Sequence, residues 1–272
     1  MTSKGGGTLI AIGGHEDRKG EKVILREVAR RVGAGPLVIS TVASEEPDGL
    51  FEEYRKAFRD LGVKDVVALD IEVRADALPE EAAASLAKAR GVFFTGGDQL
   101  KMTSQIGDTA VFRAIQRMHR EGGVVAGTSA GASVLCETML VSGAEDESAQ
   151  VGELVRMAPG LGLASGVLID QHFAERGRLG RLVGGVAENP KTVGIGIDED
   201  TAVVLKGDGF TVIGQGAVYV IDASGVTASN ITEGTEGETL SVFDVRLHVL
   251  AAGDRFDLGK RRPSRGKAGG KR

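Results

Sequence analysis

The sequence predicts an α/β protein built on a mostly parallel sheet, with a β-rich C-terminal extension. In the first half of the chain, short apolar runs alternate five times with helix-like segments. Strands that are apolar on both sides are typical of a parallel sheet buried between helices. In the second half, strand-like runs follow one another at short spacings, which favours antiparallel pairs.

Five strands and five helices are predicted in the first half. Apolar runs rich in branched side chains predict strands over residues 8–14, 36–43, 65–71, 91–95 and 124–127. Apolar side chains at helical spacing, or helix-start residues, predict helices over residues 22–33, 50–61, 79–89, 109–121 and 130–140.

The second half predicts one helix followed mainly by strands. The helix covers residues 174–187 and ends at Asn189-Pro190, because the residue before a proline disfavours helical geometry. Strand-like runs follow at residues 192–197, 201–206, 210–213, 217–222 and 239–250. No linker-like stretch separates the halves, so we expect one α/β domain over residues 1–259.

The composition excludes several classes of protein. Hydrophobic residues make up 42% and charged residues 26% of the 272 positions, which is typical of a globular chain with a sizeable core. The single cysteine, Cys136, excludes an internal disulfide framework and a cysteine-rich zinc site. No apolar run approaches the ~20 residues that a membrane span needs, and no signal peptide is evident, so we expect a cytoplasmic protein.

Charge is concentrated at the C-terminus. The segment Lys260 to Arg272 carries seven basic residues and no acidic ones, whereas the remainder has 26 basic against 38 acidic residues. A basic, glycine-rich segment of this kind predicts a disordered, solvated tail over residues 260–272. Contact with a polyanion is the alternative, but the acidic body and the scarcity of aromatic residues argue against nucleic-acid binding.

The strongest local motif is Gly127-Thr128-Ser129-Ala130-Gly131, which matches G-x-S-x-G where a strand becomes a helix. That context predicts Ser129 as a nucleophile, and the Ala130 N–H would face a developing oxyanion. The alternative is a glycine-rich turn in which Ser129 only caps the helix. A second glycine turn over residues 95–99 ends another strand, where Gly97 could supply a second oxyanion N–H. Alone, an ordinary turn would explain it.

A serine nucleophile needs a base, and the chain has four histidines. His119 lies in a polar helical stretch and His248 in a late strand, which favours surface and structural roles. His15 follows the first strand and could reach the same sheet edge. His172 caps an apolar run within an Asp-Gln-His cluster, which favours it as the base, and Glu199 ends a later strand as a candidate orienting carboxylate. The order Ser, His, Glu differs from that of the α/β-hydrolases.

Five segments together resemble the cyanophycinases, a family of serine peptidases related to dipeptidase E; they are residues 12–18, 93–99, 126–132, 170–182 and 194–202. The resemblance extends from about residue 8 to about residue 250. It implies a three-layer α/β sandwich like that of class I glutamine amidotransferases, with serine in place of their cysteine. It also implies cyanophycin as substrate, a polyaspartate whose side chains carry arginine, and β-Asp-Arg dipeptides as products.

The resemblance also implies roles for single residues. Ser129 matches the nucleophile, His172 the base and Glu199 its orienting group, and Gly97 and Ala130 match the oxyanion positions. The pocket segments are matched by Asp98, Gln99, Asp170, Gln171, Arg176, Arg178 and Arg181.

The charges of these pocket segments fit such a substrate. Asp98 and Asp170 could bind guanidinium groups, and Arg176, Arg178 and Arg181 could bind aspartyl carboxylates. A solvated basic helix flank is the alternative for the arginines.

Departures from the family pattern are His15, where a smaller residue is expected, and the basic tail. We expect no cofactor and no metal, a homodimer, and cyanophycin or aspartyl-arginine peptides as the partner. The alternatives are a related aspartyl dipeptidase or a non-catalytic binding protein of the same fold.

Overall fold

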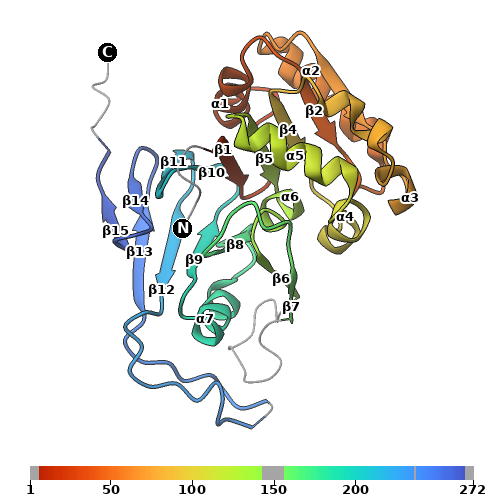
Figure 1. Ribbon diagram of the computed structural model, residues 1–272. Helices are drawn as coiled ribbons and strands as arrows, with labels where there is room; N and C mark the ends of the chain where they lie inside the picture. Colours follow the sequence, from red (N-terminus) through yellow and green to blue (C-terminus); the bar gives the residue numbers. More distant parts are fainter. Residues whose placement is uncertain (1–5, 143–155, 236, 267–272) are drawn as a thin grey trace.

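The computed structural model describes residues 6–142, 156–235 and 237–266, and its central feature is a nine-stranded sheet (Figure 1). Parallel strands follow the spatial order β1 (Thr8–Ile12), β5 (Val124–Thr128), β4 (Gly91–Phe94), β2 (Leu37–Ser40) and β3 (Val66–Leu69). Antiparallel strands extend the sheet beyond β1 in the order β10 (Thr201–Lys206), β11 (Gly209–Gly214), β14 (Arg255–Asp257) and β15 (Arg262–Ser264). The predicted α/β class is confirmed.

Helices cover both faces of the parallel strands. They are α1 (Val23–Val32), α2 (Pro47–Asp60), α3 (Arg74–Ala77), the 3₁₀ helix η1 (Glu80–Leu86), α4 (Gln99–Ile106), α5 (Ala110–Arg120) and α6 (Ala130–Ser133). The side chains of β1 show the layering, since successive residues of a strand point to opposite faces. Ile10 and Ile12 pack with α1 and α2, whereas Leu9 and Ala11 share a core with α5.

A second sheet shares the α5-side core with the main sheet. Its order is β13 (Arg246–Leu250), β12 (Val218–Asp222), β9 (Val193–Ile197) and β8 (Val167–Gln171), and α7 (Leu179–Glu188) packs on it through Leu182 and Val186. A further antiparallel pair consists of β6 (Thr138–Ser142) and β7 (Arg156–Pro159). Figure 1 shows α7 beside β9, on the side of the molecule away from α2.

The chain changes sheet between β9 and β10. These strands are consecutive in the sequence, but β9 pairs with β8 and β12, whereas β10 pairs with β1 and β11. Residues 198–200 therefore cross from one sheet to the other. Because β8 and β9 are parallel, the residues that follow them, His172 and Glu199, are brought to the same edge.

Two local expectations are wrong. A helix was expected over residues 130–140, but α6 ends at Ser133 and β6 begins at Thr138. Pairing of β6 with β7 is a tertiary effect that outweighs the local helical pattern. The predicted helix at 174–187 begins only at Leu179. Within the described ranges, no helix is long and apolar enough to cross a membrane.

The C-terminal segment also differs from the expected disordered tail. Residues 262–264 form β15, which pairs with β14, and the Arg261 side chain donates to the fully buried Asp222 and, over 2.7 Å, to the carbonyl of Lys191. Composition alone could not predict this contact, because it does not show that buried Asp222 lies within reach of Arg261. Residues 260–266 are thus part of the fold, and the remainder of the predicted tail, residues 267–272, lies outside the described residues.

Candidate active site

The carboxyl ends of β1, β5 and β4 place three chain turns side by side. Ile12 is paired with Thr128 in the β1–β5 ladder, and Phe94 with Gly127 in the β5–β4 ladder. The turns that follow these strands begin at Gly13, Ser129 and residues 95–97. Ligand and catalytic sites of open α/β sheets lie at this edge.

Ser129 stands on a sharp turn between β5 and α6. Its backbone has φ 54° and ψ −118°, a conformation that non-glycine residues rarely adopt. The flanking glycines are required by close approach: a Cβ on Gly127 would lie 2.0 Å from the Gly131 carbonyl oxygen, and one on Gly131 would lie 2.4 Å from that of Phe94. The predicted strand–turn–helix context of the G-x-S-x-G motif is therefore present.

A continuous chain of polar atoms starts at Ser129. Its Oγ lies 2.9 Å from His172 Nε2, and His172 Nδ1 lies 2.6 Å from Glu199 Oε1. An ionised carboxylate can only accept hydrogen bonds, so the ring proton belongs on Nδ1. His172 Nε2 is then free to accept the serine hydroxyl proton, which is the arrangement that activates a nucleophile.

The electrostatics keep the imidazole neutral and the carboxylate ionised. Burial lowers the pKa of His172 below its ordinary value, and the Arg176 charge acts in the same direction. Burial alone would raise the pKa of Glu199, but hydrogen bonds from His172 and His15 outweigh it and the pKa is lowered. A neutral base beside an ionised carboxylate is the state needed for proton abstraction.

Backbone bonds fix His172 and Glu199 in place. His172 has φ 46°, and its N–H donates to the Gly13 carbonyl over 2.8 Å. The Glu199 N–H donates to Glu175 Oε1 over 3.1 Å. Buried Asp198 links the turn after His172 to the start of β12. Its carboxylate accepts the N–H of Ala174 over 3.0 Å and that of Ala217 over 3.1 Å.

Comparison with known proteins fits this geometry. The sequence profile described as "Peptidase family S51" matches residues 9–213. The chain therefore belongs to peptidase family S51. Proteins named cyanophycinase from Synechococcus elongatus and a Nostoc species are 40% and 41% identical to this S51 chain, over 93% of it and 79% and 86% of their own lengths. A peptidase from an acI-B1 actinobacterium has a similar fold, with TM-score 0.63 and 22% identity over 92% of this chain and 96% of its own.

The second glycine turn of this S51 chain lies against Ser129. A Cβ on Gly96 would lie 3.4 Å from that of Ser129, and one on Gly97 would lie 2.0 Å from the Ala43 carbonyl oxygen. Gly97 has φ 133°, which also favours glycine. Gly96 thus brings this turn against the serine, and the oxyanion role of Gly97 and Ala130 stays a prediction.

Asp98 is exposed to solvent, whereas Gln99 is buried. The Asp98 side chain is exposed and caps α4 by accepting the N–H groups of Leu100 and Lys101. Gln99 is buried, and its amide donates to the Leu140 carbonyl over 2.6 Å. We expected Gln99 to contact substrate, but its side chain instead links α4 to β6.

A buried charge cluster is formed by three residues that we expected to bind substrate: Asp170, Arg178 and Arg181. Arg181 binds both carboxylate oxygens of Asp170, through Nε at 2.6 Å and through Nη2. Arg178 Nη1 lies 3.3 Å from Asp170 and donates to the Gln171 carbonyl over 2.7 Å. One carboxylate thus binds two guanidinium groups, and the cluster supports the backbone next to His172. The resemblance implied pocket positions for them, and the sequence pattern alone does not reveal their burial.

Gln171 and Arg176 stay near the serine. Gln171 Oε1 lies 3.5 Å from Ser129 Oγ, and the Gln171 side chain is otherwise buried. Arg176 is exposed on the turn after His172, close enough for its charge to lower the pKa of that histidine. Both remain candidates for substrate contact.

Sequence analysis placed His15 at this sheet edge but did not predict the contacts that His15 and Glu16 make there. Buried Glu16 accepts hydrogen bonds from the hydroxyls of Thr128, which precedes the serine, and Tyr54. His15 Nδ1 lies 2.8 Å from the second oxygen of Glu199. The signal was the polar cluster that follows the apolar β1 run, at the same sheet edge.

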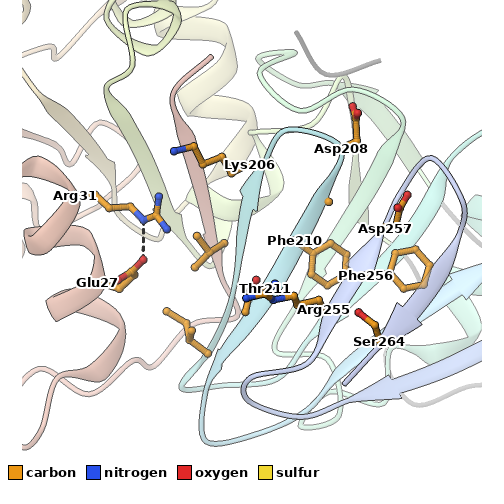
Figure 2. Close-up of a pocket in the computed structure, with 13 residues that line it drawn as sticks. Glu27, Arg31, Lys206, Asp208, Phe210, Thr211, Arg255, Phe256, Asp257 and Ser264 are labelled. Atoms are coloured by element: carbon orange, nitrogen blue, oxygen red, sulfur yellow. Dashed lines mark hydrogen bonds and ion pairs between the residues drawn. The ribbon is translucent and has the colours of Figure 1, made fainter. Parts of the chain in front are cut away.

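The largest cavity described lies elsewhere. Figure 2 shows it between Glu27 and Arg31 of α1 on one side and Phe210 and Phe256 of the antiparallel strands on the other, with a volume of about 570 Å³. None of its lining residues belongs to the Ser129 site. Acidic and basic groups are balanced around it, so its charge favours no ligand class.

Two imidazoles and a carboxylate, His15, His172 and Glu199, hold potential metal-ligating atoms within 4.8 Å of one another. Such a set suits a divalent transition metal. In this S51 chain each histidine instead directs its Nδ1 at a different oxygen of Glu199, so the three side chains satisfy one another.

Proposed function

We propose that this chain is a serine peptidase that hydrolyses cyanophycin to β-Asp-Arg dipeptides through an acyl-enzyme intermediate. The observation that carries the proposal is the chain of contacts Ser129 Oγ–His172 Nε2 and His172 Nδ1–Glu199 Oε1, at 2.9 and 2.6 Å. Membership of peptidase family S51 and the cyanophycinase names of relatives at about 40% identity support the substrate.

In the proposed mechanism, Ser129 Oγ attacks the carbonyl carbon of a peptide bond in the aspartyl backbone. His172 Nε2 accepts the hydroxyl proton, and Glu199 stabilises the imidazolium that results. The Gly97 and Ala130 N–H groups donate to the oxyanion of the tetrahedral intermediate. When that intermediate collapses, the C–N bond breaks and His172 gives its proton to the leaving amine.

Water completes the proposed cycle. His172 Nε2 takes a proton from a water molecule that attacks the Ser129 ester, and it returns that proton to Ser129 Oγ as the C–O bond breaks. The free serine and a product carboxylate result. The lowered pKa of His172 suits this role because the base must be neutral at the start of both half-reactions.

Substrate recognition is proposed for the polar groups that the fold leaves accessible. Asp98 is exposed beside the Gly96–Gly97 turn and suits a guanidinium group, whereas exposed Arg176 beside His172 suits an aspartyl carboxylate. Gln171 lies within 3.5 Å of the serine and suits the scissile region.

Finer features of the proposal follow the family resemblance: a glutamine-amidotransferase-like sandwich, exopeptidase action, a homodimer and a cytoplasmic location. Burial raises the pKa of the Cys136 thiol to about 12, which disfavours the reactive thiolate. Light scattering tests the dimer, and cell fractionation tests the location.

The test is incubation with insoluble cyanophycin and identification of the soluble products by mass. The expected product is a dipeptide of aspartate and arginine, and Ser129→Ala abolishes its formation. Ser104→Ala, which removes an exposed hydroxyl on α4, is the matched control and retains full activity. Release of free arginine, or hydrolysis only of preformed Asp-X dipeptides, would contradict the proposed reaction.

A further inference from the structure

His15 is exposed, yet its backbone is held firmly beside the candidate site. It has φ 48°, and the preceding Gly14 lies so close to the His172 ring that a Cβ there would be 2.2 Å from a ring carbon. The Gly14 carbonyl accepts the N–H of Asp200 over 2.9 Å. The turn after β1 is therefore fixed relative to His172 on one side and to the Glu199 turn on the other.

The His15 side chain uses this position to reach Glu199. His15 Nδ1 lies 2.8 Å from Glu199 Oε2, while His172 Nδ1 lies 2.6 Å from Oε1. The His15 and His172 rings meet edge to face, with centroids 5.0 Å apart and planes at 74°. Each oxygen of one carboxylate is thus bound by a different imidazole.

A second donor matters because, among the described residues, the two imidazoles are the partners that the structure shows for the Glu199 carboxylate. Its side chain is 28% exposed and has three rotatable bonds, so water competes for the oxygens and several rotamers are open to it. With His15 on Oε2, rotation of the carboxylate breaks two hydrogen bonds instead of one. Oε1 then stays directed at His172, and the His172 ring stays directed at the serine.

We propose that His15 is a positioning residue, which holds the Glu199 carboxylate in the orientation that the base His172 needs. The inference deepens the proposed serine-peptidase function and rests on it. The described contacts of the His15 side chain are with the Glu199 carboxylate and the edge of the His172 ring, so it acts through Glu199. The Nδ1–H donates in the neutral Nδ1-protonated ring as well as in the imidazolium, so the role does not require charge.

The charged groups around the His15–Glu199 contact determine how removal of His15 changes the pH dependence of activity. Asp200 follows Glu199 in the chain, Glu175 accepts the Glu199 N–H, and the Arg176 charge lowers the pKa of His172. Removal of His15 leaves Glu199 a stronger acceptor for His172, and removes a neighbour whose charge opposes the imidazolium. The acidic limb of activity therefore moves to higher pH.

The experiment compares His15→Ala with His15→Asn. Asparagine tolerates positive φ and places an amide N–H near the position of Nδ1, so it restores the donor without an imidazole. For His15→Ala we expect kcat on cyanophycin to fall about tenfold, as loss of an oriented base predicts, with KM within about twofold. We expect the acidic limb to move up by a few tenths of a pH unit, and His15→Asn to recover most of kcat.

Lys19→Ala is the matched control, because it removes an exposed cation from the same turn and keeps wild-type kinetics. Labelling of Ser129 by a fluorophosphonate reports the activation of the serine without the polymer, and it slows in parallel with kcat in His15→Ala. Unchanged kcat and labelling in His15→Ala, with Ser129→Ala inactive, would overturn the role of His15 alone. Activity in Ser129→Ala would instead overturn the proposed function on which it rests.

Discussion

Replacement of Asp170 by asparagine tests whether the buried charge cluster holds the fold or binds substrate. The carboxylate is fully buried, and its partners Arg178 and Arg181 are only 4% and 6% exposed. The substitution keeps the shape of the side chain but removes the carboxylate charge that both guanidinium groups contact. Removal of one partner from a buried ion pair costs about 3–5 kcal/mol in the free energy of unfolding.

That loss is large compared with the total stability of a domain, which is about 5–15 kcal/mol. At about 2–4 °C per kcal/mol for a protein of this size, Asp170→Asn should lower Tm by about 6–20 °C. Urea unfolding followed by circular dichroism measures the free energy, and calorimetry measures Tm. Activity at a temperature where the variant is folded should fall as well, because Arg178 supports the carbonyl of Gln171, next to His172.

Asp98→Asn is the matched control for this prediction. Asp98 is exposed, and asparagine caps a helix as well as aspartate does, so unfolding should change by less than about 0.5 kcal/mol. As a proposed guanidinium contact, however, it should raise KM for cyanophycin. If Asp170→Asn instead raised KM while leaving Tm unchanged, Asp170 would be a substrate ligand and the structural role would be wrong.

Three further predictions concern protonation, metals and the C-terminus. Because the base must be neutral and the pKa of His172 is lowered, kcat/KM should fall with decreasing pH only below the usual titration range of histidine; a limb above that range would contradict the assignment. Activity should persist in EDTA, since no proposed step uses a metal, and restoration by zinc after a loss would refute the mechanism. Truncation after Gly259 should lower Tm by several degrees, because Asp222 loses its contact with Arg261. Truncation after Gly266 should leave Tm unchanged. Equal Tm values for the two truncated proteins would show that β15 adds no stability.

The alternating strand and helix pattern was sufficient to predict the parallel half of the main sheet. It also predicted that Ser129 and the Gly96–Gly97 turn share one edge, because the carboxyl ends of parallel strands meet there. His172 and Glu199 could be placed at strand ends by the same logic. Their meeting depends on the parallel pairing of β8 and β9, which the spacing of the strands did not reveal.

The remaining features depend on tertiary partners that local patterns do not contain. Arg178 and Arg181 look like a solvated flank until Asp170 is placed beneath them. Arg261 looks like part of a disordered tail until buried Asp222 is seen as its partner. The contact of His15 with Glu199 likewise joins the turn after β1 to the crossover between β9 and β10, so only the three-dimensional structure could show it.

The central claim is that Ser129 forms a covalent acyl-enzyme with His172 as its base. Its most direct test is mass spectrometry of the protein quenched during turnover of cyanophycin, followed by mapping of the adduct to a peptide. The account predicts an aspartyl ester on Ser129 that is absent from Ser129→Ala and strongly reduced in His172→Ala. An adduct on another residue, or steady turnover of cyanophycin by Ser129→Ala, would contradict it.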